Sequence, residues 1–128
     1  MNKLWGDITP DKELEKFCVG DDLAVDTKLL PHDIKATLAH VQMLASLNLL
    51  SKNELADIEN GLNELSKIVS KKGFKIPEKY EDGHSFIEFE LHKSCNKLAR
   101  KIHFLRSRND QSLTMIRLFM QQKLKPQA

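Results

Sequence analysis

Apolar residues recur along this 128-residue chain at the three- and four-residue spacing that is typical of amphipathic helices. From Asp33 to about Leu50 they are so frequent that a helix there needs neighbours on several sides. A second helix is predicted from a capping box formed by Ser51 and Glu54. Its apolar residues form a narrow seam suited to one partner helix: Leu55, Ile58, Leu62, Leu65 and Val69.

Two more helices are predicted after a loop over residues 74–83. One begins near His84 and keeps a single apolar face as far as Ile102. The other begins near Ser107, which forms a second capping box with Asp110. The apolar seam of this last helix consists of Leu113, Ile116, Met120 and Leu124.

Together these elements predict an all-α, antiparallel helical fold in a single domain over residues 1–128. Thr9 and Pro10 indicate the start of a short helix, residues 19–22 break it, and we expect irregular chain from there to Pro31. Residues 1–32 are thus predicted to be an irregular arm, and residues 33–125 to be helical.

The first long helix and the last helix carry more apolar surface than the few predicted neighbouring helices can cover. We therefore expect a partner, either a second copy or the remainder of a longer polypeptide.

Composition and charge narrow the possible functions. Leu outnumbers Val by 19 to 4, which favours helices over sheets. No apolar run is long enough for a membrane span and the N-terminus lacks a signal-peptide pattern, so we expect a cytoplasmic protein. Residues 91–128 contain nine basic residues and one acidic residue, Asp110, whereas residues 1–90 carry a net charge of −6. This asymmetry predicts an anion-binding face or a basic segment that meets an acidic partner.

The predicted start of the last helix holds the strongest cluster of candidate binding residues. Free backbone N–H groups and the helix dipole favour an anion there, and arginine and amide side chains add to that preference. The cluster is Arg106, Ser107, Arg108, Asn109, Asp110 and Gln111. A second candidate is His84, which follows an acidic turn and can transfer a proton near neutral pH. Taken alone, the cluster also fits an ordinary polar cap, and His84 fits a capping histidine.

Five segments, in one order along the chain, resemble a known enzyme family. Residues 101–111 match a pattern close to K-[IL]-H-T-[GA]-R-S-R-N-D-Q, and residues 81–88 match E-D-V-H-x-x-I-E. Residues 33–44 resemble D-[IV]-x-G-S-x-A-H-A-x-M-L, and residues 3–6 and 17–21 add two shorter matches. On these motifs the chain resembles the argininosuccinate lyases of the fumarase/aspartase superfamily.

The resemblance implies a helical enzyme of arginine biosynthesis that eliminates fumarate from argininosuccinate and releases arginine, with no metal or other cofactor. On that resemblance Arg108 and Asn109 hold substrate carboxylates, and His84 contacts the substrate directly or through a neighbour. The rest of the expected substrate-binding set is Gly20, Ser107, Asp110 and Gln111. The implied partners are argininosuccinate and either further copies in a homo-oligomer or the remainder of a longer lyase chain. Neither nucleic acid nor a membrane is expected.

Some positions depart from the family pattern. Gly20 stands where many members have a serine that contacts substrate, and Phe104 and Leu105 stand where the family has threonine and a small residue. The T-H-x-Q and G-S-S-x-M-P-x-K segments, which supply the family's catalytic acid and base, do not occur in these 128 residues. We therefore expect an N-terminal portion of such a lyase that carries substrate-binding residues and no catalytic residue.

Two alternatives remain open at this point. Gly20, Phe104 and Leu105 favour a non-catalytic helical binding or scaffold module derived from the lyase. The basic stretch over residues 93–108 fits nucleic-acid binding, although Phe104 is its single aromatic residue for stacking on bases.

Overall fold

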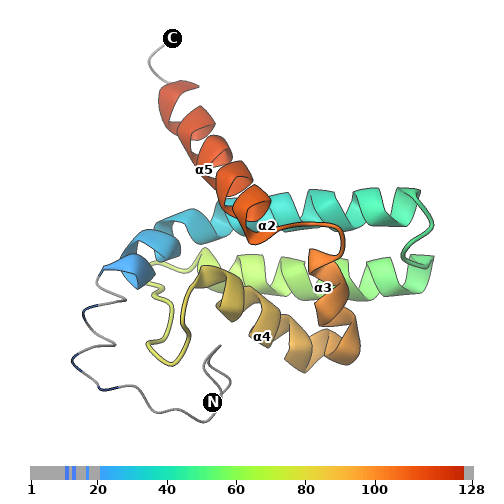
Figure 1. The fold of residues 1–128 in the computed structure, drawn as a ribbon, viewed down its shortest axis with the longest axis horizontal. Coiled ribbons are helices and arrows are strands. Elements are labelled where there is room, and N and C mark those ends of the chain that lie inside the picture. The colour runs from blue at the N-terminus through green and yellow to red at the C-terminus, as the bar shows by residue number, and fades with distance from the viewer. Residues whose placement is uncertain (1–10, 12, 14–16, 18–20, 126–128) are drawn as a thin grey trace.

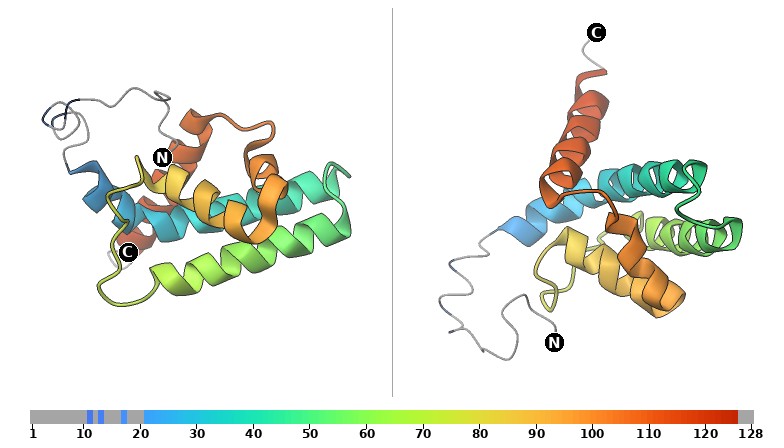
Figure 2. Two further views of the ribbon diagram at one scale, coloured as in Figure 1. Left: turned by 90° about the horizontal axis from the view of Figure 1, so that it is seen from below. Right: turned by 45° about the vertical axis from the view of Figure 1, so that its right-hand side comes forward.

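The computed structural model of the protein describes residues 11, 13, 17 and 21–125. Within these residues the chain forms helices and no strand, which confirms the all-α prediction. The elements are α2 (Asp22–Ser46), α3 (Lys52–Val69), α4 (Gly83–Cys95), the 3-10 helix η1 (Asn96–His103) and α5 (Arg108–Leu124). Helices α2 and α3 lie antiparallel, α4 and η1 pack beside them, and α5 projects from this body (Figures 1 and 2). Most of the short helix predicted from Thr9 lies outside the described residues, and the two residues of it that are described as helical are Glu13 and Phe17.

Both predicted capping boxes are confirmed. The Ser51 hydroxyl accepts the backbone N–H of Glu54 at 3.2 Å, and the Glu54 carboxylate accepts the N–H of Ser51 at 2.8 Å. At the start of α5, the Ser107 hydroxyl and the Asp110 carboxylate accept each other's backbone N–H at 3.2 and 3.3 Å. These reciprocal bonds satisfy N–H groups that a helix start leaves without internal partners.

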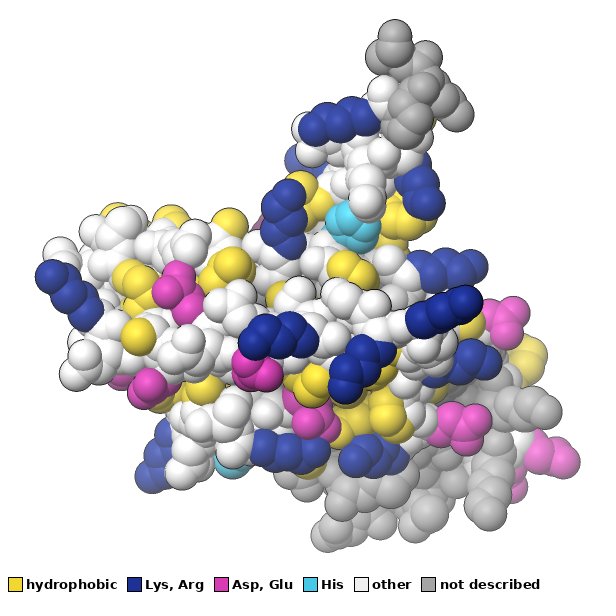
Figure 3. All heavy atoms as spheres, turned by 180° about the vertical axis from the view of Figure 1, so that it is seen from behind, with side chains coloured by type: hydrophobic (Ala, Val, Ile, Leu, Met, Phe, Trp, Pro, Cys, Tyr) yellow, Lys and Arg dark blue, Asp and Glu magenta, His cyan; other side chains and the backbone are white. Residues whose placement is uncertain are grey.

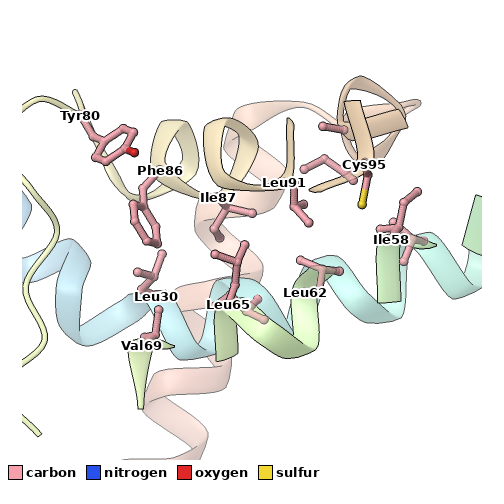
Figure 4. Packing of buried hydrophobic residues seen from close by; sticks show 14 of the residues in the cluster. Leu30, Ile58, Leu62, Leu65, Val69, Tyr80, Phe86, Ile87, Leu91 and Cys95 are labelled. Atoms are coloured by element: carbon pink, nitrogen blue, oxygen red, sulfur yellow. The ribbon is translucent and has the colours of Figure 1, made fainter. Parts of the chain in front are cut away.

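The apolar seam of α3 is buried, as the spacing predicts, but the prediction of a single partner helix is wrong, because α3 packs against both α2 and α4. Figure 4 shows side chains of α3 pointing toward those of α4 across the core. Both sets are buried: Ile58, Leu62, Leu65 and Val69 on α3, and Phe86, Ile87 and Leu91 on α4. Gly61 lies at the closest approach, because a Cβ atom added there would lie 2.7 Å from Leu91 Cδ2. The glycine therefore serves the packing of the two helices.

The predicted start of the first long helix is wrong. Helix α2 begins at Asp22, eleven residues before the expected start at Asp33, and it continues through Pro31. A proline inside a helix removes one backbone hydrogen bond and costs about 3 kcal/mol. Pro31 itself is exposed, whereas the neighbouring Leu30 is 1% exposed and belongs to the core. Burial of this early part of α2 offsets the cost of the proline.

Two hydrogen bonds from distant segments also hold the early part of α2. The Thr27 hydroxyl accepts the backbone N–H of Ile76 at 3.2 Å, and the Asp26 carboxylate accepts that of Gly83 at 2.8 Å. The partners lie 49 and 57 residues apart in the chain. No local pattern of residues 19–32 indicates such contacts, which is why the irregular arm was predicted too long.

The third predicted helix is also shorter than expected. Helix α4 ends at Cys95, and Asn96 adopts a positive φ of 51° with a ψ of −126°. Asparagine tolerates a positive φ better than most residues. The chain then continues as η1, which buries Ala99 and Ile102 completely. The apolar residues that suggested one continuous face therefore lie on two differently wound helices.

Helix α5 packs against α2, with Gln111 and Met115 buried in its first half and the Phe119 ring edge-on to His32 of α2 in its second half, 5.6 Å between ring centroids. The seam predicted from its sequence is uncovered: Leu113, Ile116, Met120 and Leu124 are 41–56% exposed. The partner expected for this face stays a prediction. None of the helices in the described part of the chain combines the length and hydropathy needed to cross a bilayer.

Candidate functional site

The first turns of α4 and α5 meet through one carboxylate. Asp82 precedes α4, and its Oδ1 accepts the backbone N–H of Ser85 at 2.7 Å, which caps the helix. Its Oδ2 lies 2.9 Å from Arg108 Nη1, at the first residue of α5. Asp82 therefore caps one helix and holds the guanidinium group at the start of the other.

His84 follows Asp82 by two residues and is 8% exposed. Its Nδ1 is 2.6 Å from Asp33 Oδ2 on α2, and its Nε2 is 3.3 Å from the Ser112 hydroxyl on α5. Because a carboxylate accepts, Nδ1 carries the hydrogen, so in neutral His84 the Ser112 hydroxyl donates to Nε2. The imidazole thus joins α2, α4 and α5.

The environment of His84 favours its charged form. Burial is the strongest single influence and lowers its pKa, but the hydrogen bond and negative charge of Asp33 outweigh it, with help from Asp82. The positive charge of Arg108 opposes them. The net result is a pKa above the ordinary 6.5 for a histidine.

One face of α2 contacts the segment that precedes α5. Three residues at positions i, i+4 and i+7 form this face, which we name the α2 polar stripe: Asp33, Thr37 and His40. Arg106 Nη1 donates to the Thr37 hydroxyl at 3.3 Å, and that hydroxyl reaches Asp33 Oδ1 at 3.4 Å. His40 Nε2 donates to the backbone carbonyl of Phe104 at 2.9 Å. The stripe therefore binds the chain on the N-terminal side of α5.

The residues predicted to bind substrate divide into two groups in the structure. Arg108 and Asn109 are exposed in the first turn of α5, where backbone N–H groups lack partners within a helix. Ser107 and Asp110 are engaged with each other, since the Ser107 hydroxyl donates to Asp110 Oδ2 at 2.8 Å. The bonds from Ser107 hold the pKa of Asp110 below its ordinary value. The first pair is exposed, although Arg108 already pairs with Asp82, and the second pair builds the helix cap.

The other expected site residues are less accessible. Gln111 is 3% exposed, and its Nε2 has no hydrogen-bond partner in the described part of the chain. A buried amide without a partner is uncommon and costs stability. His84 is too deeply buried for direct contact with a large ligand. Gly20 lies outside the described residues.

Two hollows lie beside α2, and neither is lined by Arg108 or Asn109. The cavity beside His84 has a volume of about 10 Å³, which is room for one water molecule. A much larger open groove of about 930 Å³ lies between α2 and α5. Its walls are rich in lysine: Lys28, Lys35, Lys123 and Lys125. Figure 3 shows basic side chains on both the projecting α5 and the body beside it.

In residues 11, 13, 17 and 21–125, no group of three histidine, cysteine or acidic side chains is placed to hold a metal ion.

Sequence reasoning missed several residues of this arrangement. In the sequence Asp33 opens a helix and a family motif, and Asp82 lies in an acidic turn within another motif, but neither pattern indicates a role in the site. The spacing of Asp33, Thr37 and His40, four and then three residues, places polar groups on one face of an otherwise apolar helix. That spacing was the available signal of a buried polar contact. Nothing in the local sequence marked Ser112.

Chemically, the exposed start of α5 suits a carboxylate. It combines a guanidinium group, an amide side chain and a positive helix end, each of which attracts an anion. Asp82 limits the free positive charge, because it already pairs with Arg108. An incoming carboxylate therefore has to share Arg108 with Asp82 or replace it.

Comparison with known proteins assigns the class. Residues 9–127 match the family described as "Lyase", so the chain belongs to this lyase family of the fumarase/aspartase superfamily. Its curated relatives include argininosuccinate lyases. The enzyme of Thermotoga neapolitana is 45% identical over 124 residues, which are 96% of this chain and 31% of the relative.

Two further relatives bear the same name. The argininosuccinate lyase of Stenotrophomonas maltophilia is 39% identical over 117 residues, which cover 91% of this chain and 27% of that enzyme. The one of Bacteroides fragilis is 37% identical over 124 residues, which cover 96% and 28%. The chain thus spans about a third or less of the length of the curated relatives it matches.

Proposed function

We propose that this chain forms the part of an argininosuccinate lyase that binds a substrate carboxylate, with Arg108 and Asn109 as the contacts. The observation that carries the proposal is the position of the R-S-R-N-D-Q segment. It opens α5, and its Arg108 guanidinium is held 2.9 Å from Asp82 of the E-D-x-H segment. Two segments that resemble lyase motifs and lie far apart in the sequence therefore converge at one surface.

The elimination explains why such a surface is useful. A base removes a proton from the carbon beta to the leaving nitrogen, and the electron pair is delocalised into the adjacent carboxylate. An acid protonates the departing guanidino nitrogen, which yields fumarate and arginine. Negative charge on the carboxylate rises in the transition state, so donors fixed beforehand lower the barrier. In this chain Arg108, Asn109 and the first N–H groups of α5 are those donors.

We assign neither the proton-removing base nor the acid to a described residue of this chain. Both ring nitrogens of His84 are engaged, with Asp33 and Ser112, and the ring is buried. We therefore expect the 128-residue chain to bind substrate without turning it over. Incubation with argininosuccinate, followed by the ultraviolet absorbance of fumarate, tests this. Turnover near that of a full-length argininosuccinate lyase would contradict it.

We also propose that the exposed seam of α5 is covered by another helix in the working protein. Its occupant is a second copy of this chain or the remainder of a longer lyase polypeptide. Four apolar side chains on one helix face, each 41–56% exposed, support this proposal: Leu113, Ile116, Met120 and Leu124. A continuous apolar face of that kind is typical of a helix that packs against a neighbour.

Calorimetric titration with argininosuccinate tests carboxylate binding. We expect saturable heat with the wild-type chain and an affinity about tenfold to 100-fold lower in Arg108→Gln, because a hydrogen bond to a charged group contributes about 1.5–3 kcal/mol. Arg100→Gln is the matched control, since Arg100 is an exposed arginine on η1. Equal affinities for the two variants would contradict the assignment.

A second candidate function is a scaffold without substrate binding. It is favoured by the pairing of Arg108 with Asp82, and by Phe104 and Leu105, which are 52% and 72% exposed beside the site. A scaffold gives no saturable heat in the same titration. The calorimetric result therefore separates the two functions.

A further inference from the structure

The carboxylate of Asp33 is buried in the middle of α2, with 1% of the residue exposed. A charge in such a place is stable only when partners surround it. Its Oδ2 accepts the Nδ1–H of His84 at 2.6 Å, and its Oδ1 lies 3.4 Å from the Thr37 hydroxyl, which donates to it. Each oxygen therefore leads toward a different part of the candidate site.

One path leads from Asp33 through His84 to α5. His84 Nε2 lies 3.3 Å from the hydroxyl of Ser112, which follows Arg108 by one helical turn. Because Asp33 fixes the hydrogen on Nδ1, it leaves Nε2 of the neutral ring as an acceptor for that hydroxyl. The orientation of the ring, and with it this contact to α5, depends on Asp33.

The second path leads from Asp33 through Thr37 to the residue two places before Arg108. Arg106 Nη1 donates to the Thr37 oxygen at 3.3 Å. One turn further along the α2 polar stripe, His40 donates to the carbonyl of Phe104 at 2.9 Å. The segment that opens α5 is thus held on both sides, by Arg106 before it and by Ser112 within the helix.

We propose that Asp33 is a positioning residue, which sets the start of α5 so that Arg108 and Asn109 face a substrate carboxylate. This inference rests on the function proposed above and deepens it. Asp33 itself touches no ligand, because it is enclosed and acts through His84 and Thr37. Binding groups displaced by about 1 Å can lose on the order of 100-fold in function, so a remote carboxylate can affect the site strongly.

The test compares Asp33→Asn with Asp22→Asn in the 128-residue chain. Both variants remove one negative charge from α2, but Asp22 is exposed in its first turn. Fumarate serves as the dicarboxylate probe. We expect its dissociation constant to rise about tenfold or more in Asp33→Asn and to stay at the wild-type value in Asp22→Asn. Equal dissociation constants in the two variants overturn the proposal.

A double-mutant cycle separates positioning from a general loss of stability. If Asp33 acts through His84, then Asp33→Asn combined with His84→Gln weakens fumarate binding no more than the stronger single change. Fully additive losses overturn the path through His84. NMR of the ring adds a direct readout: we expect Asp33→Asn to lower the pKa of His84 and to mix its tautomers. An unchanged ring overturns the proposal.

Two further measurements keep the proposal falsifiable. Should Asp33→Asn fail to fold, Thr37→Val removes only the hydroxyl between Asp33 and Arg106. We expect weaker fumarate binding in it, and wild-type affinity would overturn the Thr37 path. Should the wild-type chain bind no fumarate, the proposed function fails, while the positioning role stays testable by NMR. Asp33→Asn then has to shift the amide signals of residues 106–112 more than Asp22→Asn does, and equal spectra overturn it.

Discussion

Leu105 is held in a backbone conformation that suits glycine, which makes Leu105→Gly an informative substitution. Its φ is 59°, in the left-handed region, and the other non-glycine residues described there are two asparagines, Asn48 and Asn96. Asparagine tolerates this region, whereas leucine does so poorly. The side chain of Leu105 is 72% exposed, so burial recovers little of the cost. Its neighbours fix the turn, because Arg106 N–H donates to the carbonyl of His103 at 3.0 Å.

The magnitude follows from two opposing effects. Removing Cβ relieves about 1–2 kcal/mol of left-handed strain, and the greater freedom of glycine in the unfolded chain returns about 0.5–1 kcal/mol. We expect Leu105→Gly to raise the free energy of unfolding by about 0.5–1 kcal/mol net. For a domain of this size that is a rise in Tm of about 2–6 °C.

Thermal unfolding followed by circular dichroism measures this effect. Leu105→Ala is the matched control, because it removes the exposed side chain but keeps Cβ and the strain. We expect its Tm to stay close to that of the wild-type chain. The strain argument is refuted if Leu105→Gly melts no higher than Leu105→Ala. Strain beside a binding site is often part of its function, so the same pair of variants is worth testing for fumarate affinity.

Three other outcomes are expected. Gly61→Ala should lower the free energy of unfolding by up to about 2 kcal/mol. Overpacking against Leu91 costs about 1–3 kcal/mol, which exceeds the gain in helix propensity of about 1 kcal/mol. Urea unfolding checks this, and a stabilised variant would contradict it. The raised pKa of His84 means that the folded chain binds more protons than the unfolded one, so stability should fall as pH rises from about 6.5 through the folded pKa. Urea midpoints across this range should show the fall in the wild-type chain and lose it in His84→Gln. Light scattering should give a mass above the 14.7 kDa monomer, and Ile116→Glu on the exposed seam should reduce it, whereas a wild-type monomer would contradict self-association.

Local signals were enough to predict the helix starts that depend on local bonds. Both capping boxes join residues three apart, so the pattern of Ser51 and Glu54 contains all the atoms that form the bonds. The α3 seam was equally predictable, because helical spacing alone decides which of its residues share a face. The same argument placed His84 correctly in the first turn of α4.

Contacts between distant segments account for what the sequence left open. Pro31 indicated a boundary, yet α2 continues through it because Leu30, Thr27 and Asp26 meet partners elsewhere in the chain. The bond between Asp33 and His84 joins residues 51 apart, and neither residue's neighbours reveal the other. The motif resemblance indicated which segments matter. The three-dimensional fold was needed to identify the buried carboxylate that connects them.

The central claim is that the first turn of α5 binds a carboxylate, and NMR titration of the nitrogen-labelled chain with fumarate tests it most directly. The account predicts saturable shifts of the backbone amides of residues 108–110 and of the Arg108 side chain, and their loss in Arg108→Gln. Saturable shifts confined to the lysine-lined groove between α2 and α5, or no saturable shift at the start of α5, would contradict it.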